Sequence, residues 1–80
     1  MSRDEAEKII VSVLRKNVPG LELTEAKMDE TLVDLGVDSL DIMLVIMEAG
    51  EAAGITIDDD EAEELDTPRK IVDFITGKSA

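Results

Sequence analysis

Residues 34–41 read Asp34-Leu35-Gly36-Val37-Asp38-Ser39-Leu40-Asp41, and they mark the point where a long loop ends and a helix begins. Asp38 is a good N-cap residue, because a short polar side chain can accept a hydrogen bond from the free amides of a helix start. Asp41 adds negative charge to the first turn, at the positive end of the helix dipole. The pattern predicts a helix from about Ser39 to Ala53, ended by Gly54.

The helix predicted over residues 39–53 is apolar around an unusually large part of its circumference. Its inward stripe consists of Ile42, Val45, Ile46, Ala49 and Ala53. The opposite side holds Asp41, Leu44, Glu48 and Glu51, with Met43 and Met47 on the flanks. Leu44 is therefore expected on the solvated face, among acids. A helix with so much apolar surface either is covered on both sides or presents a contact patch.

Two more helices are predicted, one near each end of the chain. The first runs from about Arg3 to Asn17 and begins with a capping box of Ser2 and Glu5. Its apolar stripe is Ala6, Ile9, Ile10, Val13 and Leu14. The last helix opens with Thr67 as N-cap and Pro68 at the first helical position. We expect its Ile71, Phe74 and Ile75 to face inward, Val72 to flank them and Gly77 to end the helix.

The first connection, residues 18–38, is long for a small domain. Structureless loops beyond about 12–15 residues are unusual in compact domains, so we expect this one to be pinned to the core. Its apolar residues are Leu21, Leu23, Met28, Leu32, Val33, Leu35 and Val37. A short helical turn is predicted near residues 24–27, and Gly36 is expected to supply a special backbone angle before the next helix.

The connection before the last helix is shorter and strongly acidic. Residues 55–57 alternate as in a strand but have no partner strand, so they are expected to form an extended link that buries Ile55 or Ile57. Residues 58–66 are expected to form one or two weakly held helical turns. The patterns together predict an all-α fold: a small four-helix bundle with a long first loop and a short third helix.

Length and hydropathy set further bounds. A chain of 80 residues and 8.7 kDa allows a single domain over residues 1–80. Its longest uninterrupted apolar run, residues 42–47, is far shorter than the roughly 18 residues that a membrane span needs. The first residues show no apolar signal-peptide region. These features predict a soluble, intracellular protein without a membrane span.

The composition argues against several kinds of chemistry. A formal net charge of −12 largely rules out nucleic acid as the main partner, because every phosphate would meet a field of like sign. The chain has no Cys and no His, which excludes disulfides, His general bases and Cys/His zinc sites. Its lysines stand in polar or terminal contexts, so a self-contained enzyme is disfavoured. The acidic run 58–66 lacks the spacing and glycine of an EF-hand loop, which favours a solvated acidic face.

The hydroxyl of Ser39 is the strongest candidate for chemistry. At the first position of a helix it is expected to be exposed, with unpaired backbone N–H groups directed at whatever is attached to its oxygen. The helix dipole also favours negative charge there, which suits a phosphodiester. The alternative is that Ser39 merely helps to begin the helix. Asp38 is expected to occupy the capping role, which leaves Ser39 free for another one.

The whole chain resembles the acyl carrier proteins, a family of small acidic four-helix proteins that carry acyl groups as thioesters. The resemblance rests on residues 34–41, on the length, low pI and helix order, and on the ending Ile71-Val72-Asp73-Phe74-Ile75-Thr76-Gly77. It implies that Ser39, between Asp38 and Leu40, is the attachment point for 4′-phosphopantetheine. A separate phosphopantetheinyl transferase would transfer that group from coenzyme A, and its terminal thiol would carry the acyl chain.

The resemblance also implies how such a carrier meets its partners. Acids of the second helix would face basic patches on acyl-transferring and acyl-processing enzymes, and the carrier would work as a cytoplasmic monomer. The residues expected on this partner-binding face are Asp41, Met43, Leu44, Met47, Glu48 and Glu51, with Asp38 beside them. The apolar cavity that shelters an acyl chain in the family would be lined here by residues such as Val45, Ile46, Ala49 and Phe74.

Several positions depart from the family's usual pattern. Leu44 and Gly50 stand where carriers of fatty-acid synthesis usually have acids, which favours a specialised carrier with a partner that has an apolar pocket. The alternative for Leu44 is a lone exposed apolar residue. The expected role is a carrier for fatty-acid or related lipid or specialised acyl biosynthesis. Carriers of D-alanine, other amino acids or polyketide units remain alternatives, as does an acidic adaptor that is not a carrier.

Overall fold

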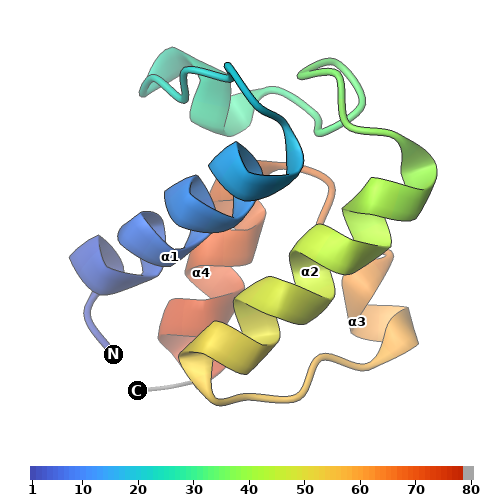
Figure 1. Ribbon diagram of the computed structural model, residues 1–80. Helices are drawn as coiled ribbons and strands as arrows, with labels where there is room; N and C mark the ends of the chain where they lie inside the picture. Colours follow the sequence, from blue (N-terminus) through green and yellow to red (C-terminus); the bar gives the residue numbers. More distant parts are fainter. Residues whose placement is uncertain (79–80) are drawn as a thin grey trace.

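The structure of this protein is a computed structural model that describes residues 1–78. Its architecture consists of four α-helices (Figure 1). The helices are α1 (Arg3–Asn17), α2 (Ser39–Ala53), α3 (Asp59–Ala62) and α4 (Pro68–Lys78), with a short 3₁₀ helix, η1 (Ala26–Asp29), in the long first loop. Residues 1–78 contain no β-strand. The all-α four-helix prediction is confirmed, as are the bounds of α1 and α2.

The core lies where α1 packs against α2 and α4. Its largest fully buried side chains come from all three helices and from the loop: Ile10, Leu14, Leu32, Val45, Pro68, Ile71, Val72 and Ile75. Two details of α4 differ from the prediction. Val72 is fully buried and Phe74 is only half-buried, so the inward face of α4 is turned toward Val72. The helix also continues through Gly77 to Lys78.

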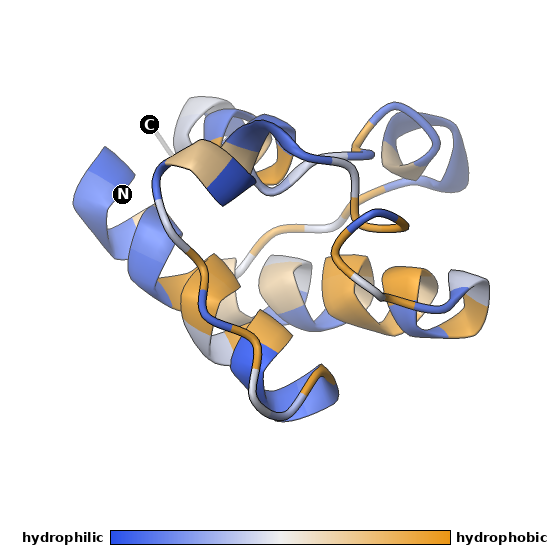
Figure 2. Ribbon diagram, turned by 90° about the horizontal axis from the view of Figure 1, so that it is seen from above, coloured by the Kyte–Doolittle hydropathy of each residue, from blue (hydrophilic) through white to orange (hydrophobic). Residues whose placement is uncertain are grey.

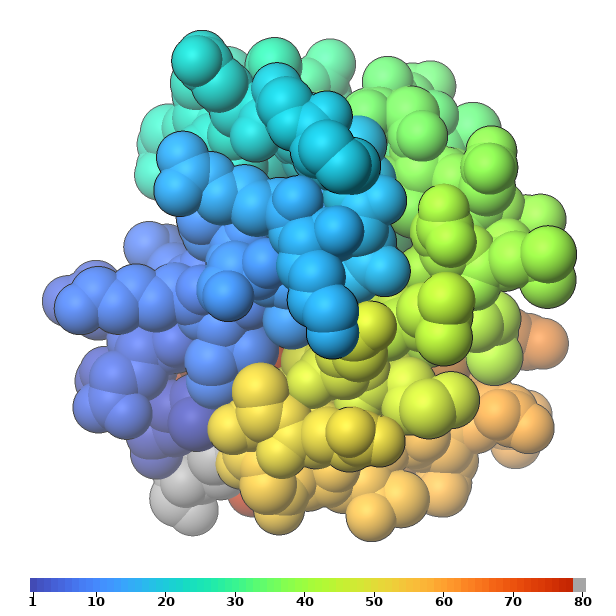
Figure 3. All heavy atoms as spheres, in the orientation of Figure 1, coloured from blue at the N-terminus to red at the C-terminus, as the bar shows by residue number. Residues whose placement is uncertain are grey.

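Ion pairs join the helices at the surface of this core. Lys16 of α1 pairs with Glu48 of α2 at 3.1 Å, and Arg3 of α1 pairs with Asp73 of α4. Figure 3 shows the side chains of α1 and α2 meeting along one seam, the seam that Lys16 and Glu48 bridge. Because both side chains of an exposed pair must be held in one geometry, each such pair contributes only about 0–1 kcal/mol.

The long first loop is anchored to the core largely as its apolar residues predict. Met28, Leu32 and Val37 are buried. The predicted helical turn is present: the Lys27 and Met28 amides bond to the carbonyl of Thr24, and the 3₁₀ helix that follows spans Ala26–Asp29, two residues beyond the predicted range. Val33 is an exception to the expected anchoring, since its side chain is 68% exposed and lies outside the core.

The link between α2 and α3 passes very close to α2. Gly54 ends α2 with φ +73°, and residues 55–57, which have no regular secondary structure, leave both Ile55 and Ile57 half-buried. A Cβ atom on Gly50 would lie 3.2 Å from the Ile55 carbonyl oxygen and 3.3 Å from the Ile57 side chain. The absence of a side chain at Gly50 therefore allows the link to pack directly on the helix.

Candidate functional site

Ser39 is the first residue of α2, and its side chain is exposed. Asp38 occupies the N-cap position with extended backbone angles, φ −66° and ψ 155°, as the sequence predicts. Its side chain, however, makes no capping hydrogen bond. The expectation that Asp38 satisfies the helix start is therefore wrong in its chemistry, although the position is right. The first backbone amides of α2 therefore donate no hydrogen bond to the Asp38 side chain.

Those amides lie directly beside the Ser39 hydroxyl. The first backbone bond of α2 runs from the Ile42 N–H to the Asp38 carbonyl, at 2.9 Å. Within residues 1–78, the amides of Ser39, Leu40 and Asp41 have no hydrogen-bond acceptor, nor does the Ser39 hydroxyl have a partner. Free N–H groups at a helix start attract anionic oxygen, and the helix dipole adds to that attraction. The geometry thus fits a hydroxyl that carries a phosphodiester.

The loop before α2 holds Ser39 at the surface. Three consecutive amide bonds of about 3.0 Å coil the chain just before the helix: Leu35 to Thr31, Gly36 to Val33 and Val37 to Leu32. Gly36 has φ +92°, an angle that side chains strongly disfavour, which confirms the predicted role of this glycine. Val37 is buried while Asp38 and Ser39 are exposed, so the chain leaves the core just before the hydroxyl.

The acidic residues expected around Ser39 differ in their surroundings. Asp38 and Glu51 are exposed, and Asp41 is half-buried. Glu48 is also half-buried, and its carboxylate is paired with Lys16 of α1. Asp38, Asp41 and Glu51 have no ion-pair partner within the described chain. The structure therefore separates Glu48, which braces two helices, from the acids that are unpaired.

An exposed apolar strip runs along α2 from the Ser39 end, and Figure 2 shows hydrophobic colouring over much of this helix. The strip consists of Leu40 (81% exposed), Met43 (49%), Leu44 (45%) and Met47 (55%). Leu40 is the most exposed of them, although the sequence pattern singled it out only as a neighbour of Ser39. Exposed apolar side chains that adjoin one another on a helix typically mark a contact surface.

Two adjoining hollows lie between α2 and α3, next to the apolar strip. One has a volume of about 270 Å³ and the other about 600 Å³, and Met43 and Ile46 line both. Val33, which was expected to be anchored in the core, is exposed and lines the larger one. The sequence could not reveal this, because a loop has no periodicity that tells inward from outward residues. Val45 and Ala49, expected to line a cavity, are fully buried in the core.

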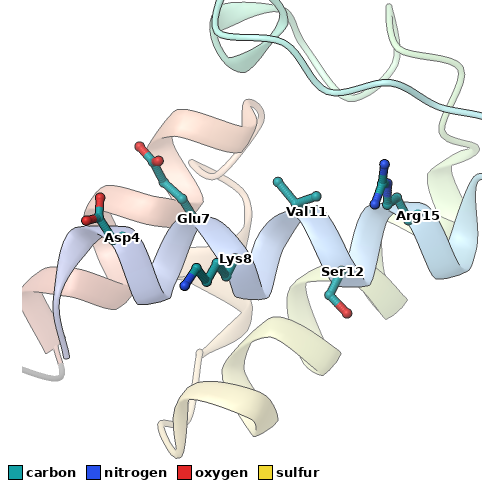
Figure 4. Close-up of a pocket in the computed structure, with 6 residues that line it drawn as sticks. All are labelled: Asp4, Glu7, Lys8, Val11, Ser12 and Arg15. Atoms are coloured by element: carbon teal, nitrogen blue, oxygen red, sulfur yellow. The ribbon is translucent and has the colours of Figure 1, made fainter.

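A further hollow of about 560 Å³ lies along the outer face of α1 (Figure 4). All six lining residues come from that one helix: Asp4, Glu7, Lys8, Val11, Ser12 and Arg15. Ser12 also bears an exposed hydroxyl, but it lies in the middle of a helix, where the amides are bonded along the helix. This surface therefore lacks the free amides found at Ser39.

Comparison with known proteins agrees with the geometry. A family model described as "Phosphopantetheine attachment site" matches residues 8–75. An acyl carrier protein of Nitratidesulfovibrio vulgaris is 34% identical over 76 residues, which cover 94% of this chain and 93% of the relative. An acyl carrier protein of Tropheryma whipplei is 32% identical over 81 residues and covers 100% of this chain and 98% of the relative.

A solved structure shows the same likeness in three dimensions. The solution structure of the acetyl actinorhodin acyl carrier protein from Streptomyces coelicolor superposes with a TM-score of 0.69 at 29% identity, covering 99% of this chain and 91% of that one. The chain belongs to the acyl carrier protein family, whose phosphopantetheine-attachment domain carries 4′-phosphopantetheine covalently on a serine. It has an acyl carrier role, served in this family by phosphopantetheinyl transferases and acyl-processing enzymes. Within residues 1–78, no helix has both the length and the apolarity to cross a bilayer.

Proposed function

We propose that Ser39 is the serine to which 4′-phosphopantetheine is attached, and that the chain carries acyl groups for fatty-acid or related specialised biosynthesis. The observation that supports this most directly is the exposed Ser39 hydroxyl beside three amides without acceptors. When bound, the group supplies a thiol that holds the acyl chain as a thioester. We propose that the protein itself is a single, monomeric, non-catalytic domain of the cytoplasm.

Each residue at the start of α2 has a part in this proposal. On the transferase, Ser39 Oγ would lose its proton and bond to the phosphorus that bears the pantetheine arm of coenzyme A. The bond from that phosphorus to the nucleotide part would break, and the nucleotide would leave with the bridging oxygen. The amides of Leu40 and Asp41 would donate hydrogen bonds to the phosphodiester, and the dipole of α2 would stabilise its charge. The Leu40 side chain, which is exposed, would lie beside the arm as an apolar contact for the transferase.

The test is the intact mass of the protein after incubation with coenzyme A and a phosphopantetheinyl transferase. Wild type is expected to gain the mass of one phosphopantetheine group, and Ser39→Ala none. Ser12→Ala is the matched control, because it removes an exposed hydroxyl from the middle of α1 and should be modified like wild type. An unmodified wild type, or modification of Ser39→Ala, would overturn the assignment. The first of these results would favour an acidic adaptor.

We also propose that the apolar strip of α2 and the acids around it form the face that partner enzymes recognise. Asp38, Asp41 and Glu51 are unpaired and would meet basic patches, which speeds encounter through charge complementarity. Met43, Leu44 and Met47 would enter an apolar pocket of the partner, since methionine adapts its shape readily. Glu48 would add little, because Lys16 already neutralises it.

Two substitutions that remove the same charge, Glu51→Gln and Glu48→Gln, distinguish the roles of these two acids. Glu51→Gln is expected to lower the association rate with the transferase, because an unpaired charge is removed. The reduction should be larger at low salt, where charges are screened less. Glu48→Gln should change this rate less and instead lower stability by a few tenths of a kcal/mol, as expected for a surface ion pair. Stopped-flow association at two salt concentrations measures both. Equal effects of the two variants would contradict the proposed face.

Leu44→Glu tests the apolar part of the same face. Leu44 is 45% exposed, so its replacement is expected to leave folding nearly intact while changing which partner enzymes bind. The measurement is binding to several acyl-processing enzymes, with urea unfolding as the check on stability. A large loss of stability would show that Leu44 belongs to the core, and unchanged partner choice would show that it is a lone exposed residue.

A further inference from the structure

Arg69, in the first turn of α4, binds the long first loop at three points. Its Nε donates to the Asp29 carboxylate at 2.7 Å, and its Nη2 donates to the Glu25 carboxylate at 2.9 Å. The same Nη2 also lies 3.5 Å from the Glu25 carbonyl oxygen. Glu25 is the residue just before η1 and Asp29 is its last residue, so one guanidinium joins the two ends of η1 to the start of α4. We call this arrangement the Arg69 clamp.

The geometry of the clamp suits arginine in particular. The guanidinium is planar and presents several donors in a fixed fork, which lets it hold two carboxylates at once. Its side chain is 28% exposed, whereas those of Glu25 and Asp29 are 80% and 67% exposed. The two carboxylates are thus drawn to a partly sheltered cation, and their hydrogen bonds hold the pKa of Arg69 above its ordinary value.

The clamped segment leads directly into the loop that positions Ser39. Just after Asp29, the Leu32 amide bonds to the Asp66 carbonyl at 2.9 Å, next to the start of α4. The amide bonds of residues 31–37 then carry the chain to Asp38. The Asp38 side chain makes no capping bond at α2, so the hydrogen bonds that lead up to its first turn are the amide bonds of this loop.

We propose that Arg69 is a positioning residue for phosphopantetheine attachment: it holds the loop at residues 25–29 and thereby keeps the Ser39 hydroxyl and the free amides of α2 in register. This inference rests on the proposed role of Ser39. Arg69 lies on α4, and its side-chain hydrogen bonds go to Glu25 and Asp29 of the loop rather than to Ser39 or the face of α2 that partners would bind. Its loss should therefore displace or loosen the reacting hydroxyl while leaving the docking face intact.

The expected kinetic signature follows from that separation. Small misplacements of a reacting group lower the rate of reaction strongly, so Arg69→Met should lower kcat of transferase-catalysed attachment by about three- to tenfold. KM for the carrier should change by less than about twofold, because α2 still docks. Amide hydrogen exchange of residues 24–41 should become faster in the same variant.

Three further variants separate positioning from a general loss of stability. Arg3→Met makes the same charge change and breaks a pair between α1 and α4, away from the loop, so it should leave kcat unchanged. Arg69→Lys keeps the charge without the fork and should restore kcat only partly. Asp29→Asn should reproduce part of the loss, and adding it to Arg69→Met should lower kcat little further. All variants are assayed at a temperature at which urea unfolding shows them to be folded.

The outcomes distinguish this inference from the assignment of Ser39. If wild type is not modified, the role of Ser39 fails and the positioning role fails with it. If wild type is modified but Arg69→Met keeps its kcat, the positioning role alone is overturned, whatever the exchange data show. Equal losses in Arg69→Met and Arg3→Met would also overturn it, because a general effect of charge or stability would then suffice.

Discussion

The starts of α1 and α2 are similar in sequence and different in structure. Each helix follows a short polar residue, Ser2 or Asp38, and each has acids in its first turn. At α1, the Ser2 hydroxyl accepts a hydrogen bond from the Glu5 amide at 3.2 Å and lies 3.3 Å from the Glu5 carboxylate. At α2, the Asp38 side chain makes no such bond.

The difference shows where local stability has been given up. A side-chain cap typically contributes about 1 kcal/mol, so a helix start without one is less stable than it could be. The amides of α2 remain free next to an exposed hydroxyl, whereas the start of α1 uses its hydroxyl internally. Departures from local rules are expected at functional sites, and here the departure coincides with the proposed attachment point.

The largest expected effect tests whether the loop, rather than a cap, supports the start of α2. Leu32 precedes Ser39 and is 1% exposed, while Leu40 follows it and is largely exposed. Leu32→Ala should lower the free energy of unfolding by about 2–5 kcal/mol, because it leaves a cavity where the loop meets the core. Leu40→Ala should change it by less than about 0.5 kcal/mol.

Urea unfolding of the two variants measures this difference. The substitutions are chemically identical, so side-chain size cannot account for unequal results. A loss above 1 kcal/mol for Leu40→Ala would mean that its side chain packs in solution, and the contrast between a buried support and an exposed neighbour would fail.

A smaller effect is expected from the helix caps themselves. The Thr67 hydroxyl accepts from the Lys70 amide at 3.2 Å, as the sequence predicts. Thr67→Ala should therefore lower the free energy of unfolding by about 1 kcal/mol, and Ser2→Ala by about 0.5–1 kcal/mol. Asp38→Ala should cost less than Ser2→Ala, since no capping bond is lost. If thermal unfolding shows a loss for Asp38→Ala as large as that for Ser2→Ala, the starts of α1 and α2 are alike after all.

The smallest effect concerns Asp66, whose backbone carbonyl accepts a hydrogen bond from the Leu32 amide. A side-chain hydrogen bond from Lys70 holds the pKa of the Asp66 carboxyl below its ordinary value of 3.8. The group therefore stabilises the fold above the ordinary pKa of the unfolded chain, and this contribution is lost as pH falls through the lower pKa of the folded state. The stability difference between wild type and Asp66→Asn should shrink as pH is lowered below about 4.

Urea unfolding at several acidic pH values follows this difference, and the large common effect of the other carboxylates cancels in the comparison. Attachment of phosphopantetheine to Ser39 should be unchanged in Asp66→Asn, because the backbone bond to Leu32 remains. A difference that stays constant across the acidic range would show that Lys70 does not bind Asp66 in solution.

Much of the fold could be predicted because periodic segments reveal which side faces the core. The bounds of α1 and α2, the left-handed Gly54 and the cap of α4 all follow from local chemistry. The loop was harder to predict: Leu32 and Val33 are adjacent apolar residues, yet one is buried and the other exposed. Leu32 also bonds through its amide to the Asp66 carbonyl, a contact distant in sequence that no local pattern predicts.

The candidate site could be located from the sequence but not described in full. The sequence correctly predicts that Ser39 is exposed at the first position of α2. The missing cap could not be foreseen, because Asp38 is chemically able to cap and only its conformation prevents it. The role of Arg69 could not be foreseen from the sequence either, since its partners Asp29 and Glu25 are 40 and 44 positions away along the chain.

Because the link packs closely on Gly50, adding a single carbon atom there would change the shape of the smaller hollow between α2 and α3. Alanine would favour the helix by about 1 kcal/mol over glycine, but its methyl group would press on Ile55 and Ile57. The link would have to retreat by a few tenths of an ångström, and the hollow that Gly50 and Ile57 line would change its shape. A substitution too small to alter charge could thus act as a wedge that reshapes this hollow without touching Ser39, the proposed attachment point.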